Sequence, residues 1–218
     1  MRIIKGEFTK EEKLVVLQLY EDNLLYIAAL KELQTRAEIL REDFRKNECY
    51  NPIEHIKTRI KKPESIIKKV YLKNWPLDVE TIKENMHDIA GMRIVCTFKD
   101  DIYRISEIFQ NSKDIKVLEI KDYIATQKPS GYQSYHMIVE IPVQLSSGIR
   151  HCKVEIQLRT MAMDFWASLE HKIKYKYEWE LPDEIKDELR NCSEIVDELD
   201  NNMQALYKKV HQDIQEKE

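Results

Sequence analysis

Glycine is scarce in this sequence. Only four of the 218 residues are glycine, at Gly6, Gly91, Gly131 and Gly148. This scarcity excludes a Walker A loop and a Rossmann glycine fingerprint, because both need clustered glycines to bring backbone amides close to phosphate. If the chain binds a nucleotide, it must hold the phosphates in another way.

Paired cysteines and long apolar runs are also absent. The four cysteines are scattered and form no CxxC pair; they are Cys49, Cys96, Cys152 and Cys192. We expect reduced thiols, two of them inside predicted strands. The N-terminus has no apolar signal core, and no run approaches the ~18 apolar residues that a membrane span needs. The sequence therefore predicts a soluble, cytoplasmic protein without a membrane partner.

The sequence has no excess of positive charge. Lysine and arginine number 35 against 39 acidic residues, which gives a net charge of −4. Attraction of the whole surface to nucleic acid is therefore excluded, and only local basic patches remain. The length suits one domain, residues 1–218, with no room for a second catalytic domain. Within it we expect an N-terminal helical part (1–48), a catalytic core (51–177) and a C-terminal helix (182–215).

Helical patterns occupy both ends of the chain. Thr9 and Glu12 resemble a capping box, and no proline or glycine follows until past Lys46. This segment predicts one long helix or two, with an apolar stripe of Leu14, Leu17, Leu24 and Ile27. A longer stripe comprises Ile185, Leu189, Cys192, Ile195, Leu199, Met203, Leu206 and Val210. Such a stripe needs a partner, either the N-terminal helix or another subunit.

Three segments between these helices alternate like strands. From Cys152 to Leu158 the apolar residues alternate with polar ones, and residues 135–141 and 89–97 do the same. If the three strands share a sheet, one face carries Arg93, His136, Glu155, Gln157 and Arg159, with Asp88 at its edge. Two carboxylates amid basic groups suit a divalent cation and a polyphosphate. Alternation by itself favours an ordinary antiparallel pair with one face in water, and it is the third strand, with Arg93 and Asp88, that favours a site.

A basic segment runs from Lys57 to Lys73, with Glu64 as its single acid. Pro63 suits the first turn of a helix, on which Ser65 and Lys69 would face the same side. Lys61 would precede the helix N-terminus, where free amides attract anions. The segment therefore predicts either a phosphate cradle or a solvated charged helix.

The remaining elements are expected as follows. Residues 52–59 predict a short helix, 78–86 and 101–110 two more, and 115–124 a strand. A further helix begins at Met161, and its stripe is expected in the core: Ala162, Phe165, Trp166, Leu169 and Ile173. Asp164 lies on another face of that helix.

Five motifs together point to a family. They are RIKKPESIIKK, HDIAGMRIV, KPSGYQSYH, VEIQLRT and MDFWASLEHK. In this order they resemble the (p)ppGpp synthetase domain of the Rel/Spo family, in particular its single-domain small alarmone synthetases. NPIEHIKTR resembles the RelP branch more than the RelQ branch. The resemblance covers roughly Asn51 to Tyr177 and implies an α+β fold. It comprises a mixed, mostly antiparallel sheet of the nucleotidyltransferase-like synthetase type, flanked by helices, with long N- and C-terminal helices.

The resemblance also implies an activity. The family transfers pyrophosphate from ATP to the 3′-hydroxyl of GDP or GTP, giving AMP and ppGpp or pppGpp. By this likeness Asp88 and Glu155 coordinate Mg²⁺, and Glu155 also takes the proton from the hydroxyl. Arg59 and Arg93 sandwich adenine. The resemblance further implies that the ATP phosphates are bound by Lys61, Ser65 and Lys69. The acceptor nucleotide is bound by Lys128, Tyr132, His136, Gln157 and Arg159.

Three positions depart from the family pattern. Ser130 stands where asparagine is usual, and Tyr135 where leucine is common. His55 replaces an aromatic residue that lines an alarmone-binding cleft in the RelQ branch, at the centre of the tetramer. The family also implies a homotetramer built through the terminal helices.

Two rival functions remain. His87 and Asp88 form the HD dyad of metal phosphohydrolases, but the other histidines supply no matching ligand pattern. A catalytically inactive protein that binds nucleotide or RNA through the basic segment is the alternative from another class. The aromatic residues near that segment are not spaced as a stacking platform for bases.

Overall fold

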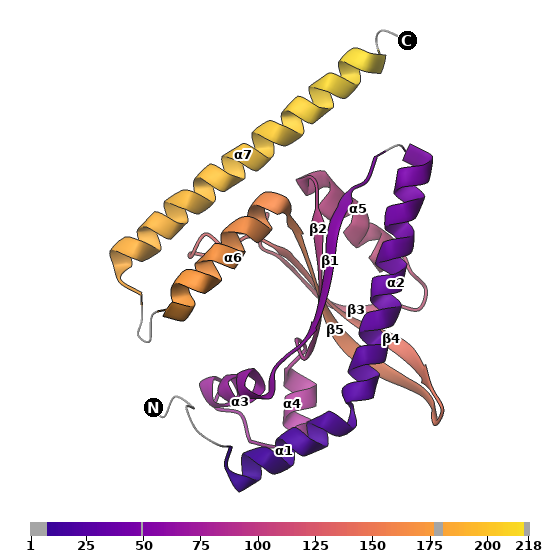
Figure 1. Ribbon diagram of the computed structural model, residues 1–218, viewed down its shortest axis with the longest axis vertical. Helices are drawn as coiled ribbons and strands as arrows, with labels where there is room; N and C mark the ends of the chain where they lie inside the picture. The colour runs from indigo at the N-terminus through magenta and orange to yellow at the C-terminus, as the bar shows by residue number, and fades with distance from the viewer. Residues whose placement is uncertain (1–7, 49, 177–180, 216–218) are drawn as a thin grey trace.

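The structure is a computed structural model that describes residues 8–48, 50–176 and 181–215. In chain order its elements are α1 (Lys10–Glu21), α2 (Asn23–Glu48), β1 (Ile53–Ile60), α3 (Pro63–Leu72), α4 (Val79–Asn85), β2 (Ala90–Cys96), α5 (Lys99–Gln110), β3 (Lys116–Asp122), β4 (Tyr135–Leu145), β5 (Gly148–Thr160), α6 (Met161–Lys176) and α7 (Asp183–Gln215). Figure 1 shows how these helices surround a single sheet. Across the described ranges, no helix is long and apolar enough to cross a membrane.

The sheet is mixed and mostly antiparallel, as expected. Its strands lie in the order β1-β2-β5-β4-β3. Only the β2–β5 pair is parallel, and the other three pairs are antiparallel. After β2 the chain leaves the sheet to form α5, adds β3 at the far edge of the sheet and β4 beside it, and then returns as β5 next to β2. This path brings the predicted polar positions of β2 and β5 next to each other.

One face of the sheet forms the hydrophobic core. On β5 the alternating residues Cys152, Val154, Ile156 and Leu158 are at most 2% exposed. α2 and α5 pack over this face within the same core cluster. They meet each other where the Arg104 guanidinium lies 4.5 Å above the Phe44 ring. The period-two pattern therefore predicted the buried face correctly.

The N-terminal segment forms two helices rather than one. The capping box is confirmed, because Thr9 Oγ1 accepts from the Glu12 amide at 3.1 Å and the Glu12 carboxylate accepts from the Thr9 amide at 2.6 Å. The helix breaks at Asp22, whose carboxylate accepts from Arg150 on β5 at 2.7 Å and also pairs with Lys83 on α4. Asp22 thus fixes the corner between α1 and α2 to the sheet.

The prediction of a helix over residues 52–59 is wrong, because this segment is the edge strand β1. Its residues pair antiparallel with β2, from Ile53 opposite Cys96 to Ile60 opposite Ala90. Ile53, Ile56, Thr58 and Ile60 are β-branched and suit a pleated surface. Strand pairing with β2 outweighs the local helix signals that follow Pro52.

The predicted core stripe of α6 is only partly correct. Trp166 is buried as predicted, but Phe165 is 63% exposed, and the buried Met163 lies outside the stripe. The Trp166 indole donates to the Leu189 carbonyl at 2.9 Å, so α7 determines which side of α6 is covered. A periodic stripe shows that a helix is amphipathic, but its partner decides which residues are buried.

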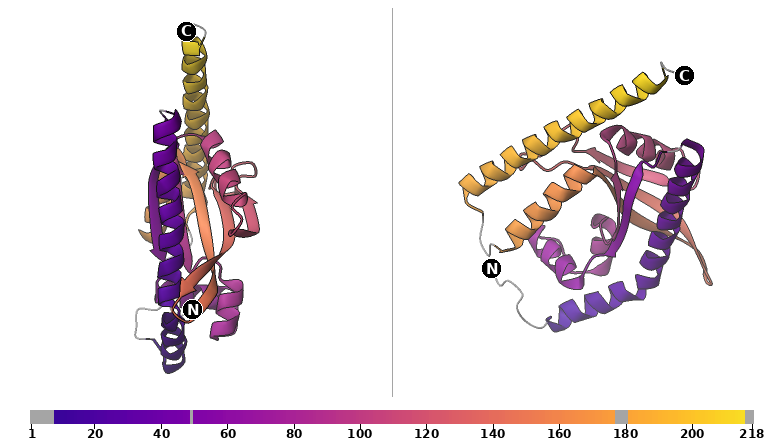
Figure 2. Two further views of the ribbon diagram at one scale, coloured as in Figure 1. Left: turned by 90° about the vertical axis from the view of Figure 1, so that its right-hand side faces the viewer. Right: turned by 45° about the horizontal axis from the view of Figure 1, so that its top comes forward.

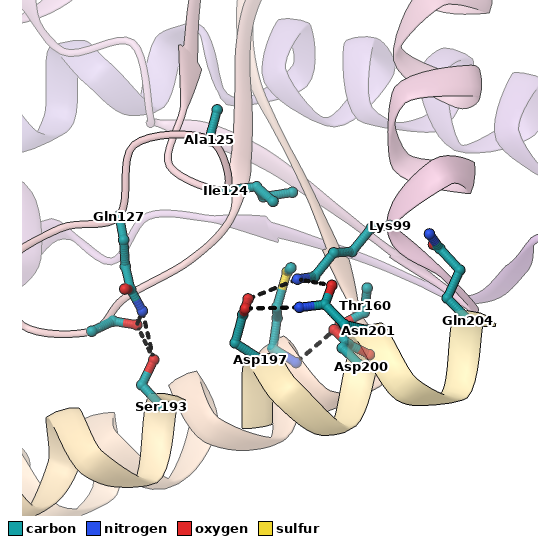
Figure 3. A network of polar contacts seen from close by, with 12 residues as sticks. Lys99, Ile124, Ala125, Gln127, Thr160, Ser193, Asp197, Asp200, Asn201 and Gln204 are labelled. Carbon is teal, nitrogen blue, oxygen red and sulfur yellow. Dashed lines mark hydrogen bonds and ion pairs between the residues drawn. The ribbon is translucent and has the colours of Figure 1, made fainter. Parts of the chain in front are cut away.

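The long helix α7 contacts the core through polar residues. Figure 3 shows these contacts: Lys99 donates to Asp197 at 2.7 Å and Asn201 at 2.8 Å, while Asp200 accepts from Thr160. The opposite side of α7 exposes large apolar residues, namely Ile195, Leu199, Met203, Leu206 and Val210. Its surface is therefore divided into a polar side against the core and an apolar side toward solvent.

The two terminal apolar stripes do not cover each other. Figures 1 and 2 place α1 and α7 at opposite ends of the molecule. Leu14, Leu17 and Leu24 are 60%, 64% and 66% exposed. The alternative in which both stripes pack together within one chain is therefore wrong for this fold.

Candidate active site

The second face of the sheet carries the predicted polar residues in two rows across the strands. In one row Arg93 on β2, Gln157 on β5 and His136 on β4 are direct neighbours. In the adjacent row Glu155 on β5 lies between Gly91 on β2 and Ile138 on β4. The sheet therefore brings these side chains together, as the sequence predicted.

Asp88 lies just before β2 and is held by two lysines. Lys61 Nζ is 2.7 Å from Asp88 Oδ2, and Lys69 Nζ is 2.8 Å from Oδ1. Burial raises the pKa of Asp88, but the hydrogen bonds from both lysines outweigh it and leave this pKa below its ordinary value. The carboxylate is thus ionised, and its charge is neutralised by two residues expected to bind phosphate.

Glu155 is also contacted by two side chains, those of His136 and Gln157. Its Oε1 is 3.2 Å from His136 Nδ1, and its Oε2 accepts from Gln157 Nε2 at 2.8 Å. Burial raises the pKa of Glu155, but contacts with His136 and Gln157 outweigh burial and lower this pKa below its ordinary value. The proximity of the Asp88 charge opposes that lowering. The two carboxylates are therefore close enough for the charge of Asp88 to raise the pKa of Glu155.

A closed ring of hydrogen bonds surrounds the acceptor side of this face. Arg159 Nη2 donates to the Tyr132 hydroxyl at 2.7 Å, and this hydroxyl is 2.8 Å from His136 Nε2. His136 contacts Glu155, which accepts from Gln157, and Arg159 Nη2 donates to Gln157 Oε1 at 3.3 Å. Each of the five side chains thus has its orientation set by two neighbours.

The segment between β3 and β4 supplies further acceptor candidates. Lys128 Nζ lies 4.1 Å from the Tyr123 ring centre and 4.9 Å from that of Tyr132, which suits a cation held by aromatic faces. Tyr123 is edge-on to Tyr132, with ring centres 6.1 Å apart. Sequence reasoning missed Tyr123, which lies in the loop directly after β3.

Within the described residues, the side chains of the remaining ATP candidates, Arg59 and Ser65, form no hydrogen bond with another site residue. Arg59 is exposed on β1, and its Nε lies 3.6 Å from where a Cβ at Gly91 would be. Ser65 is exposed in the first turn of α3, where Pro63 takes the first helical position as predicted. Arg59 is thus on the strand that leads to Lys61, and Ser65 is on the helix that carries Lys69, but neither contacts Asp88.

Helix α7 positions the acceptor loop. The Ser193 hydroxyl donates to the Gly131 carbonyl, and Gln127 Nε2 donates to Ser193 Oγ at 2.9 Å (Figure 3). Arg190 Nε donates to the Pro129 carbonyl at 3.0 Å. Gly131 has a φ of +86°, and a Cβ there would lie 2.7 Å from Ser193 Cβ. Glycine is therefore required at 131 both by its backbone conformation and by the close approach of α7.

Asp164 was not expected to belong to the site. Its Oδ1 is 3.0 Å from Arg93 Nη1 and 3.1 Å from Arg159 Nη1. The signal that could have found it is its place five residues after Arg159, in the first turn of the helix that continues β5. Helical position alone does not show that this side chain returns to the sheet.

The structure shows the surroundings of two residues that depart from the family pattern, Tyr135 and His55. Tyr135 points to the apolar face, where its ring is edge-on to Tyr103 at 5.7 Å, so the departure concerns the core. His55 is exposed on the edge strand β1. Neither side chain contacts the two carboxylates.

The donor atoms present fit a magnesium ion. Over the part of the chain that the structure describes, no three histidine, cysteine or acidic side chains gather as a metal cluster. Magnesium commonly binds through one or two carboxylates and completes its shell with water and substrate phosphates. Asp88 and Glu155, both ionised and on one face, match that requirement.

Comparisons with known proteins agree with this geometry. Residues 58–180 match the family model described as "Region found in RelA / SpoT proteins". The chain is 44% identical to the GTP pyrophosphokinase YwaC of Bacillus subtilis, over 86% of this chain and 89% of that protein. It is 41% identical to the GTP pyrophosphokinase YjbM of the same organism, over 83% and 84%.

A solved structure is similar over nearly its whole length. It is the small alarmone synthetase 1 of Bacillus subtilis bound to its product pppGpp, with a TM-score of 0.82 and 40% identity. The match covers 88% of this chain and 98% of that one. The fold, the motif-bearing region and the close relatives all agree, and the chain belongs to the RelA/SpoT family.

Proposed function

We propose that this chain is a GTP pyrophosphokinase that transfers the β,γ-pyrophosphate of ATP to the 3′-hydroxyl of GDP or GTP. The observation that carries the proposal is the pair of ionised carboxylates on one sheet face, each contacted by side chains suited to nucleotide binding. The named activity of the relatives YwaC and YjbM, and the pppGpp bound by the similar structure, support the same reaction.

The donor subsite is proposed around Asp88. Lys61, Ser65 and Lys69 would hold the ATP phosphates, and Arg59 and Arg93 would stack on adenine. Both lysines contact Asp88, so phosphate and Asp88 would compete for the same ammonium groups. A divalent cation bound together with ATP would resolve this competition, because its charge would compensate Asp88 while Lys61 and Lys69 contact phosphate.

The acceptor subsite is proposed around the hydrogen-bonded ring. Tyr132 would stack on guanine, and Lys128 and His136 would hold the acceptor phosphates. Gln157 and Arg159 would orient Glu155 and Tyr132, which they already contact. The lowered pKa of Glu155 keeps it ionised, so it can accept the proton of the 3′-hydroxyl.

Mg²⁺ is the proposed cofactor, held by Asp88 and Glu155. When bound, it would neutralise charge that develops on the transferred pyrophosphate. Transfer of this kind depends on positioning and charge neutralisation, so no covalent nucleophile is needed. The buried thiols of Cys96 and Cys152 have no role in it, while Cys49 lies outside the described residues.

We further propose that residues 1–218 act as one synthetase domain and assemble as a homotetramer through the terminal helices. The exposed apolar stripes of α1 and α7 support assembly. The likeness of residues 51–59 to the RelP branch stays a prediction. An RNA-binding role is disfavoured, because Asp88 lies among the basic residues that would contact RNA and neutralises two of them.

The deciding experiment is incubation of the pure protein with labelled ATP, GDP or GTP, and Mg²⁺. Label should appear in ppGpp or pppGpp. Asp88→Asn and Glu155→Gln should each lower the rate at least a hundredfold, because several kcal/mol of charge stabilisation are lost. Asp114→Asn, which removes a remote carboxylate paired with Arg36, is the matched control and should keep the wild-type rate. Wild-type rates in both active-site variants, with an unchanged circular dichroism spectrum, would reject the assignment.

A further inference from the structure

Two arginines lie close together on the polar face, where Arg93 is half-buried and Arg159 is buried. Burial lowers the pKa of Arg93, and the nearby positive charge of Arg159 lowers it further. Such a pair repels itself unless an anion lies between the guanidinium groups. Asp164 is that anion, and its single oxygen Oδ1 contacts both at 3.0 and 3.1 Å.

The two arginines belong to different proposed subsites. Arg93 is a candidate for stacking on the ATP base. Arg159 holds the Tyr132 hydroxyl at 2.7 Å, and its guanidinium carbon lies 5.2 Å from the Tyr132 ring centre. Asp164 therefore joins the donor side to the ring that orients the acceptor residues.

The position of Asp164 is well determined by the fold. Its side chain is only 15% exposed, and α6 begins at Met161, directly after β5 ends at Thr160. The Thr160 hydroxyl caps the start of α6 by accepting from the Met163 amide at 3.1 Å. The carboxylate is thus carried by a helix turn fixed to the strand that bears Glu155.

We propose that Asp164 is a positioning residue that couples ATP binding to acceptor binding. This inference rests on the proposed function. When adenine fixes Arg93, the shared oxygen of Asp164 restricts Arg159, and Arg159 in turn restricts Tyr132. Each nucleotide then binds a site that the other has already ordered, and the two affinities rise together.

Calorimetry on the full chain tests the coupling. The dissociation constant of GDP is measured with and without a non-hydrolysable ATP analogue and Mg²⁺, and the ratio gives the coupling. In the wild type we expect a ratio of about five or more, within the usual range for coupled sites. Asp164→Ala should bring the ratio close to one. Asp164→Asn keeps an oxygen that can contact both guanidinium groups and should retain part of the coupling.

The controls separate coupling from mere support of the fold. Asp114→Ala removes a carboxylate from Arg36 at a distant place and should leave the ratio unchanged. If Asp164 had a purely structural role, its substitution would weaken the binding of both nucleotides without changing the ratio of the dissociation constants. If Asp164→Ala does not fold, the ratio in Asp164→Asn decides.

The outcomes also distinguish this inference from the proposed function. A wild-type ratio of one, or an unchanged ratio in both Asp164 variants, overturns the coupling while leaving the synthetase intact. Failure of the wild type to bind either nucleotide overturns the proposed function, and the coupling with it.

Discussion

At the scale of single residues, the two carboxylates of the polar face are each paired with neighbouring side chains. Lys61 and Lys69 contact Asp88, while His136 and Gln157 contact Glu155. Pairing of this kind avoids the cost of uncompensated buried charge. It also means that substrate binding would replace some of these contacts with contacts to the nucleotides.

Tyr132 provides the sharpest test at this scale, because its ring and its hydroxyl have separate roles. Tyr132→Ala should raise the KM for GDP and GTP by about 5- to 150-fold, since base stacking contributes about 1–3 kcal/mol. Tyr132→Phe keeps the ring but loses the contacts to Arg159 and His136, so its effect should be smaller. Steady-state kinetics with each acceptor would show this order, and an unchanged KM in Tyr132→Ala would make Tyr132 a packing residue.

At the scale of secondary structure, the corner between α1 and α2 depends on one acidic side chain. Burial raises the pKa of Asp22, but Lys83 and Arg150 outweigh burial and leave it below the ordinary 3.8. The stabilisation that ionised Asp22 gives the folded state is therefore complete above pH 3.8, the ordinary pKa. It is lost as the pH falls through the lowered pKa of Asp22 in the folded state.

Substitution of Asp22 should thus have a pH-dependent effect. Asp22→Asn should lower the free energy of unfolding by about 1–2 kcal/mol at neutral pH, the range for hydrogen bonds to charged groups. The difference from wild type should shrink below about pH 4. Urea unfolding at several pH values measures it, and a constant difference down to pH 2 would contradict the assigned cause.

The contact between α7 and the acceptor loop gives another prediction for an element. Ser193 is 3% exposed and contacts both Gln127 and Gly131. Ser193→Ala should therefore loosen the loop and raise the KM for GDP severalfold, with the KM for ATP nearly unchanged. Glu194→Ala, an exposed neighbour on the same helix, serves as the control. Equal changes in both KM values would assign Ser193 to general stability instead.

The sequence predicted those parts of the fold and site that depend on local periodicity. Alternation in β2, β4 and β5 identified the face of Arg93, His136 and Glu155 correctly. β1 was missed, because its strand state comes from pairing with β2 rather than from its own pattern. Asp164 was missed because its role depends on where α6 packs, which sequence spacing does not determine.

At the scale of the whole molecule, the divided surface of α7 supports assembly. Its apolar side exposes Leu199 and Met203, which are 54% and 51% exposed. We expect a homotetramer in light scattering at micromolar concentration. Leu199→Glu and Met203→Glu should dissociate it, with little loss of protomer stability, because neither side chain is in the core. A monomer mass for the wild-type protein would reject the tetramer.

The place of β5 within the sheet has a consequence for synthesis of the protein on the ribosome. β5 lies between β2 and β4, yet it comes after all the other strands that the structure describes. Until it emerges, the nascent β1–β2 and β3–β4 pairs have no strand to join them. Pairing between distant segments is also slow. Both halves of the site therefore come together late, so a chain interrupted before β5 has no complete sheet and no synthetic activity.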